Sequence, residues 1–177
     1  MRNHIISNKF SISVFMHSVI FVALLFGITV YVSSADFIKV ENFSLIDNND
    51  RVWELSENPA PAKVIMFWAT WCRYCQKLFP SIQALHEQYE KDGVQVIAIS
   101  IYDEGDTVAY AKKNGLTMTI LRGGDEIAQR LNIPATPSVL VLDDKNQIVF
   151  GAVNPKPSEN EVENSVRKLL DIPIEQI

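Results

Sequence analysis

Apolar and polar positions along the chain predict two strands with a helix between them. Residues 63–69 form an apolar run of the kind found in a strand covered on both faces, and residues 94–101 form a second such run. Between them, apolar residues recur every three or four positions, as on the buried face of a helix. These residues are Cys75, Leu78, Ile82, Leu85 and Tyr89. Pro80 is expected to kink this helix and Gly93 to end it. The pattern therefore predicts a right-handed β-α-β crossover.

Weaker patterns on both sides of this unit predict the remaining elements. They are extended structure over residues 37–55 with a turn at residues 47–50, a short helix over residues 103–114 capped by Asp103 or Asp106, a short strand at residues 116–121, a short helix at residues 125–131, a hairpin of residues 138–142 with 147–153, and a last helix that Ser158 and Glu161 open as a capping box. Elements in this order predict an α/β fold, in which a central mixed β-sheet carries helices on both faces.

The N-terminal residues carry a different pattern. Arg2, His4 and Lys9 precede an uncharged apolar run over residues 19–32, and small residues follow the run. This order is typical of an export signal, and a run of 14 residues is shorter than the ~20 that a membrane-spanning helix needs. Earlier apolar residues would lengthen it, so that residues 10–32 could instead form an anchor in the inner membrane, and a buried core helix is a further interpretation. We expect residues 1–35 to be a signal peptide or signal-anchor, and residues 36–177 to be an exported, periplasmic or otherwise extracytoplasmic domain.

Composition narrows the possible functions. The chain has 177 residues, a net charge of −5 and no cluster of Lys or Arg, which argues against binding to nucleic acid. It has only two cysteines, which cannot build a scaffold of several disulfides. We therefore expect the hydrophobic core to stabilise the fold, which leaves the cysteine pair for chemistry.

Cys72 and Cys75 lie where the first predicted strand leads into the helix. The free N–H groups and the dipole of a helix N-terminus favour an anion, so the pKa of Cys72 is expected to lie below the ordinary ~8.5 of a thiol. Arg73 adds a positive charge beside it. Cys75 is one turn later, on the buried face. We therefore expect Cys72 to be the nucleophile that attacks a partner disulfide, and Cys75 to resolve the mixed disulfide.

Other uses of a cysteine pair fit this sequence less well. A zinc site needs about four ligands, and the only histidines are His4, His17 and His86, two of them in the targeting segment. Haem attachment would need a histidine where the chain has Gln76, and an iron–sulfur cluster would need a second chain. A buried and chemically inert pair of cysteines is the remaining alternative. We expect no metal and no cofactor.

Three stretches resemble the thioredoxin superfamily. They are residues 67–75 (FWATWCRYC), Pro80 five positions after the second cysteine, and residues 133–138 (IPATPS). The resemblance implies a thioredoxin-like fold, with a cis peptide bond before Pro137 next to the cysteines and with the backbone of Thr136 paired with a bound substrate strand. It also implies substrate contacts from Trp71, Arg73 and Tyr74.

Within the superfamily, the export signal, the N-terminal hairpin and the extra segment at residues 103–131 look like the TlpA/ResA/DsbE group of extracytoplasmic thiol–disulfide oxidoreductases. That resemblance implies cysteine-containing exported proteins as substrates and a membrane thiol–disulfide electron donor or acceptor. It extends to a role in cytochrome c maturation or oxidative folding, with the direction of electron flow left open. The chain departs from the group at Met66 and Leu78, where relatives often carry polar residues.

Two other functions are alternatives to this one. A peroxidase of peroxiredoxin type also uses this fold, but its Thr-x-x-Cys motif would need a threonine where the chain has Ala69. A non-enzymatic module that binds copper or zinc through the two cysteines would have to recruit further ligands.

Overall fold

The computed structural model describes residues 38–153 and 159–173. The predicted signal or anchor at residues 1–35 lies outside these residues, and so does Ser158 of the predicted capping box. Within the two described segments, no helix is both long enough and apolar enough to cross a membrane.

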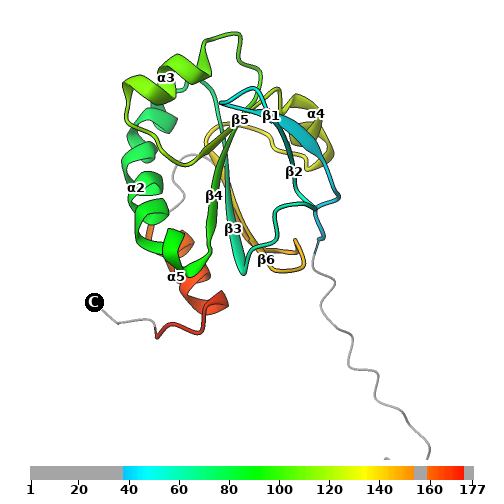
Figure 1. Ribbon diagram of the computed structural model, residues 1–177, viewed down its shortest axis with the longest axis vertical. Helices are drawn as coiled ribbons and strands as arrows, with labels where there is room; N and C mark the ends of the chain where they lie inside the picture. The colour runs from blue at the N-terminus through cyan, green and yellow to red at the C-terminus, as the bar shows by residue number, and fades with distance from the viewer. Residues whose placement is uncertain (1–37, 154–158, 174–177) are drawn as a thin grey trace, which may run out of the picture. The chain divides into compact units, whose positions relative to one another are not determined.

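The described residues form one mixed β-sheet with the strand order β2-β1-β5-β4-β3-β6-β7 (Figure 1). The strands are β1 (Ser44–Asp47), β2 (Val52–Glu54), β3 (Ala62–Trp68), β4 (Gln95–Ser100), β5 (Thr119–Arg122), β6 (Ser138–Asp143) and β7 (Ile148–Val153). β3, β4 and β5 run parallel to one another, while β6 and β7 on one side and β1 and β2 on the other are antiparallel additions. The predicted mixed sheet is confirmed.

β3 lies inside the sheet, and all seven of its residues are buried. Because side chains alternate along a strand, β3 contributes to two separate cores. Val64, Met66 and Trp68 pack in the cluster that contains buried residues of α2 (Arg73–Tyr89), α3 (Thr107–Lys113) and α5 (Glu159–Leu169). Ile65 and Phe67 pack with buried residues of α4 (Asp125–Arg130). Figure 1 shows α2, α3 and α5 on one side of the sheet and α4 on the other. Helices therefore cover both faces, as the residue pattern predicts.

α2 (Arg73–Tyr89) follows β3 directly and carries the predicted apolar face. Pro80 lies inside this helix, which is continuous from end to end, and the kink expected there stays a prediction. A short 3₁₀ turn, η1 (Glu90–Asp92), ends it, and Gly93 follows with a φ of 82°. This left-handed conformation suits glycine, and it turns the chain back into β4.

The other helices are α3 (Thr107–Lys113), α4 (Asp125–Arg130) and α5 (Glu159–Leu169). α3 begins later than residue 103, because Asp106 caps it by accepting the Ala109 N–H at 2.8 Å. β5 also begins later than residue 116, because the Leu116 N–H donates to Ala111 O at 3.0 Å and so belongs to the end of α3. The starts of α3 and β5 thus differ by three or more residues from the sequence-based prediction, while the elements themselves are present.

Candidate active site

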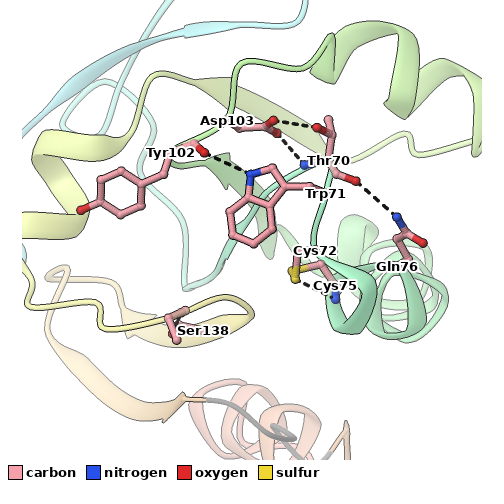
Figure 2. Close-up of a disulfide and its surroundings, with 9 residues drawn as sticks. Thr70, Trp71, Cys72, Cys75, Gln76, Tyr102, Asp103 and Ser138 are labelled. Atoms are coloured by element: carbon pink, nitrogen blue, oxygen red, sulfur yellow. Dashed lines mark hydrogen bonds between the residues drawn. A yellow bond between two sulfur atoms is a disulfide. The ribbon is translucent and has the colours of Figure 1, made fainter.

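Cys72 and Cys75 form a disulfide at the N-terminus of α2, with their Cα atoms 5.3 Å apart (Figure 2). Cys72 is the N-cap residue of the helix, and its Sγ atom accepts the Cys75 N–H at 3.1 Å. Cys72 is 4% exposed, and Cys75 is fully buried at 0%. Cys72 is therefore the more exposed of the two cysteines, and a negative charge on its sulfur would meet a backbone N–H group at a helix N-terminus.

The side chains next to the cysteines in sequence are exposed. Trp71 and Tyr74 are large, apolar and exposed, and Arg73 is exposed at the first position of α2. Exposed aromatic and Arg side chains are those that protein interfaces use most. The structure thus presents these three predicted contact residues to solvent around the disulfide.

Behind the cysteines the environment is apolar. Met66 and Leu78 are buried in the same hydrophobic cluster as Cys72 and Cys75. At these two positions the sequence departs from the TlpA/ResA/DsbE pattern, and the departure places apolar groups in the core cluster that contains the disulfide. Burial of this kind disfavours a thiolate at Cys75. The pair is thus asymmetric, with a charge-stabilised position for Cys72 and an apolar one for Cys75.

The Thr136–Pro137 peptide bond is cis, in the form that the resemblance to the thioredoxin superfamily implies. Ser138, the first residue of β6, pairs with Phe67 near the end of β3, which brings the loop before it to the same edge of the sheet as the cysteines. The Ser138 hydroxyl donates to Ala135 O at 2.6 Å and so closes the loop. Pro137 is buried and Thr136 is half-buried.

A groove of about 290 Å³ runs beside this loop. Its lining residues are Trp71, Ile101, Tyr102, Pro134, Ala135 and Thr136. Two residues expected to contact substrate, Trp71 and Thr136, therefore line one groove, although 65 positions separate them in the sequence. The side chains that line the groove are mainly apolar.

Tyr102 and Asp103 also belong to this site, and the residue pattern did not single them out for it. The Trp71 indole N–H donates to Tyr102 O at 3.1 Å, and the Thr70 N–H donates to Asp103 Oδ2 at 2.5 Å. One signal in the sequence could have located them. Both lie within three residues of the end of β4, and the carboxyl ends of the parallel strands β3 and β4 must meet at one edge of the sheet. The sequence pattern alone predicts Asp103 only as a possible helix cap.

Among the described residues, no three or more His, Cys, Asp or Glu side chains gather where they could hold a metal ion.

Comparison with known proteins identifies the family. The model of the AhpC/TSA family matches residues 38–150, which is more than half of the chain. The chain belongs to the AhpC/TSA family. The match includes both cysteines, the β4–α3 loop and the cis-proline loop of this AhpC/TSA protein.

Curated relatives of this AhpC/TSA chain bear the name thiol–disulfide oxidoreductase ResA. The ResA protein of Geobacillus kaustophilus is 26% identical over 128 residues, which cover 70% of this chain and 74% of that protein. The ResA protein of Bacillus thuringiensis subsp. konkukian is 27% identical over 135 residues, which cover 74% and 76%.

Solved structures share the fold. A thiol:disulfide interchange protein of the thioredoxin family from Chlorobium tepidum matches with a TM-score of 0.67 at 18% identity and covers 78% of this chain and 99% of that one. StoA from Bacillus subtilis matches with a TM-score of 0.60 at 18% identity and covers 72% and 97%. The predicted thioredoxin-like fold is thereby confirmed. With its cysteine pair before α2, this AhpC/TSA member is a thiol–disulfide oxidoreductase, and its sequence is similar to those of the ResA proteins.

Proposed function

We propose that the protein exchanges its Cys72–Cys75 dithiol or disulfide with cysteines of partner proteins outside the cytoplasm. The observation that carries this proposal is the position of the disulfide. The Cys72 sulfur caps α2 and accepts a backbone N–H, while Cys75 is buried one turn later. A thiolate at Cys72 is stabilised without a neighbouring base, and the resolving thiol is already in bonding reach.

The exchange proceeds in two displacements when the protein acts as a reductant. The Cys72 thiolate attacks one sulfur of a partner disulfide, which forms a mixed disulfide and releases one partner thiolate. The Cys75 thiol gives up its proton to solvent and attacks the Cys72 sulfur, which restores the Cys72–Cys75 disulfide and releases the second partner thiolate. Two electrons pass to the partner, whose thiolates take protons from water. The same steps in reverse oxidise a dithiol partner.

The surroundings of the disulfide suit an extended protein substrate. In this proposal Trp71, Arg73 and Tyr74 contact the partner from the side of α2. The backbone of Thr136 pairs with the partner's main chain, and Pro137 shapes that loop. The groove between Trp71 and Thr136 supports the assignment, because an extended segment needs both a backbone partner and room for its side chains.

The N-terminal residue pattern supports export, and the resemblance to the TlpA/ResA/DsbE group supports a membrane electron partner. Residues 1–35 would direct the domain out of the cytoplasm, and residues 10–32 would tether it to the inner membrane if they are not cleaved. A membrane thiol–disulfide protein would then supply or accept the two electrons. Cytochrome c maturation or oxidative folding would be the process served.

The test is a trap for mixed disulfides. A Cys75→Ser variant expressed in the native cell should accumulate partners bound through Cys72, because the resolving thiol is gone. Cys72→Ser should capture none, and partners identified by mass spectrometry should be exported proteins with reactive cysteines. Equal capture by both variants, or capture of cytoplasmic proteins alone, would contradict the proposal. A measured potential then gives the direction, since thioredoxin-like reductants lie near about −270 mV and DsbA-like oxidants near about −120 mV.

The competing function is the peroxiredoxin-type peroxidase, which is built on the same fold. A peroxidatic cysteine of that kind needs a threonine three positions earlier, and here that residue is Ala69, which is buried and has no hydroxyl. Peroxide consumption by the purified protein with a small thiol as the only reductant distinguishes the two functions. We expect the wild type to consume peroxide no faster than a Cys72→Ser control.

A further inference from the structure

All three polar groups of Thr70, which stands two positions before Cys72, are hydrogen-bonded within the protein. Its N–H donates to Asp103 Oδ2 at 2.5 Å, and its hydroxyl donates to Asp103 Oδ1 at 2.6 Å. Its carbonyl oxygen accepts a hydrogen bond from Gln76 Nε2 at 3.2 Å. Figure 2 shows Thr70 held from the β4–α3 loop on one side and from the first turn of α2 on the other.

Thr70 and Trp71 are the central residues of the turn that leads into the disulfide. The Cys72 N–H donates to Ala69 O at 3.0 Å and closes this turn. The Trp71 indole N–H reaches Tyr102 O, so two consecutive residues of the turn are bonded to two consecutive residues of the β4–α3 loop. Cys72 comes next in the chain, and its position at the start of α2 depends on where this turn is held.

The carboxylate of Asp103 is held by hydrogen bonds from both the turn and its own loop. It accepts a third hydrogen bond from the Gly105 N–H at 3.0 Å, so three donors surround its two oxygen atoms. A Cβ atom at Gly105 would lie 2.2 Å from Thr70 Oγ1 and 3.1 Å from Asp103 Oδ1, so a larger residue does not fit without displacing the Thr70 hydroxyl. We refer to Thr70, Asp103 and Gly105 as the Asp103 latch.

We propose that Asp103 is a positioning residue for thiol–disulfide exchange and acts through Thr70 to hold the Cys72 sulfur at the N-terminus of α2. This inference rests on the function proposed above. A thiolate on Cys72 is stabilised where its sulfur meets the Cys75 N–H and the helix terminus. When the Asp103 latch is broken, the turn moves more freely and the Cys72 sulfur lies at the helix N-terminus for less of the time. A smaller fraction of Cys72 is then ionised, and its thiolate is less often oriented towards a partner disulfide.

The experiment compares Thr70→Val and Asp103→Ala with the wild type, each as the full chain in the reduced state. One readout is the pH at which Cys72 ionises, followed by the ultraviolet absorbance of the thiolate. The other is the second-order rate constant with the small disulfide dithiodipyridine. Loss of one or two charge-assisted hydrogen bonds should raise the pH of ionisation by about half a unit to one unit and lower the rate constant at neutral pH about three- to tenfold.

Three further variants separate positioning from simple stabilisation. Thr70→Ser keeps the hydroxyl and should restore both readouts. The double variant Thr70→Val/Asp103→Ala should lose no more than Asp103→Ala alone, because the two residues act through one contact. Asp106→Ala is the matched control, since Asp106 is a carboxylate of the same loop that caps α3 through the Ala109 N–H. It should lower the melting temperature and leave both readouts unchanged.

The proposal is overturned if Asp103→Ala and Thr70→Val lower the melting temperature yet keep both the ionisation and the rate constant within about twofold of wild type. Equal effects of Asp106→Ala and Asp103→Ala would overturn it as well. If Asp103→Ala does not fold, the comparison of Thr70→Val with Thr70→Ser still decides. Failure of the proposed function would be seen elsewhere: wild-type protein would react normally with dithiodipyridine but capture no partner protein through Cys72.

Discussion

Tyr102 occupies an unusual backbone conformation at the edge of the active site. Its φ is 50°, a left-handed conformation that costs a residue other than glycine about 1 kcal/mol or more. The Tyr102 N–H donates to Asp125 Oδ1 at 2.7 Å, and its carbonyl accepts the Trp71 indole N–H. These bonds fix the backbone, and the side chain remains 51% exposed on the groove that Trp71 and Thr136 also line. A large aromatic group held in this way is suited to contact with a partner.

We therefore expect Tyr102→Ala to weaken recognition of proteins without slowing the chemistry of Cys72. The Michaelis constant for reduction of a protein disulfide such as insulin should rise about three- to tenfold, which corresponds to the loss of one aromatic contact. The rate constant with dithiodipyridine should not change, because a small disulfide does not need the groove. Steady-state kinetics with both substrates make the measurement.

Val52→Ala is the control for Tyr102→Ala, because Val52 is an exposed apolar residue on the edge strand β2. Val52→Ala should change neither the Michaelis constant for insulin nor the rate constant with dithiodipyridine. An unchanged Michaelis constant in Tyr102→Ala, or an equal loss of rate with the small disulfide, would contradict the role given to Tyr102.

At the scale of single elements, the β1–β2 hairpin is fixed by one buried carboxylate. Asp47 accepts the N–H groups of Asn49 and Arg51 at 2.7 and 2.9 Å, and the Arg51 guanidinium contacts its other oxygen. Burial acts to raise the pKa of Asp47. The hydrogen bonds and the positive charge of Arg51 outweigh burial, and the net pKa lies below the ordinary value of 3.8. The residue pattern predicted the turn at residues 47–50, and the structure gives its cause.

Asp47→Ala should destabilise the protein by about 1–3 kcal/mol at neutral pH, because two backbone N–H groups and Arg51 lose their acceptor. A carboxyl with a lowered pKa in the folded state stabilises the protein fully above its unfolded-state pKa, and this contribution is lost as the pH falls through the folded-state pKa. The difference in unfolding free energy between wild type and Asp47→Ala should therefore be constant above about pH 5 and shrink below about pH 4. Urea unfolding at several pH values measures it, and a difference that grows in acid would contradict this account.

Local residue patterns are sufficient to predict the strands and helices of this chain. Each described strand and helix lies where apolar spacing, turn residues and caps predicted it. The disagreements are at boundaries. Residues 103–106 are one example, because Asp103 and Asp106 are equally good helix caps in sequence. Only the pairing of β3 with β4 brings Thr70 to Asp103 and leaves Asp106 to cap α3.

At the scale of the whole molecule, Lys63 is a cation buried at the start of the central strand β3. It is 1% exposed, and its Nζ atom donates to Asn146 Oδ1 at 2.9 Å in the β6–β7 turn. The backbone of that turn in turn accepts the Val40 N–H at 2.8 Å. Lys63 thus links the central strand β3 to the β6–β7 hairpin at the edge of the sheet, and the same turn binds the segment at Val40. Burial lowers the pKa of Lys63, while the charges of Asp143 and Asp144 act in the opposite direction.

Lys63→Met should change how stability depends on alkaline pH. Below the folded-state pKa, Lys63 is protonated in both states, and the full cost of burying its charge is present. As the pH rises from that value towards 10.5, the folded protein releases the proton before the unfolded chain does, and the cost disappears. The wild type should therefore gain stability relative to Lys63→Met between neutral pH and about pH 10, as measured by urea unfolding.

Lys145→Met provides the comparison for Lys63→Met, because Lys145 is an exposed lysine of the same β6–β7 turn. Its stability difference from wild type should not change with pH over this range. If the stability difference between wild type and Lys63→Met is also independent of pH, burial of the charged Lys63 side chain does not destabilise the protein.

The sequence by itself determined the elements, the α/β class and the place of the cysteine pair at a helix N-terminus, because these depend on apolar spacing, caps and residues close together in the chain. Resemblance added the cis bond before Pro137. Tertiary structure alone decided that Tyr102 and Asp103 hold the turn before Cys72 and that Trp71 and Thr136 share a groove. Those contacts join residues at least 31 positions apart. They arise because parallel strands end at one edge of the sheet, and strand order is a property of the packed molecule that no local pattern contains.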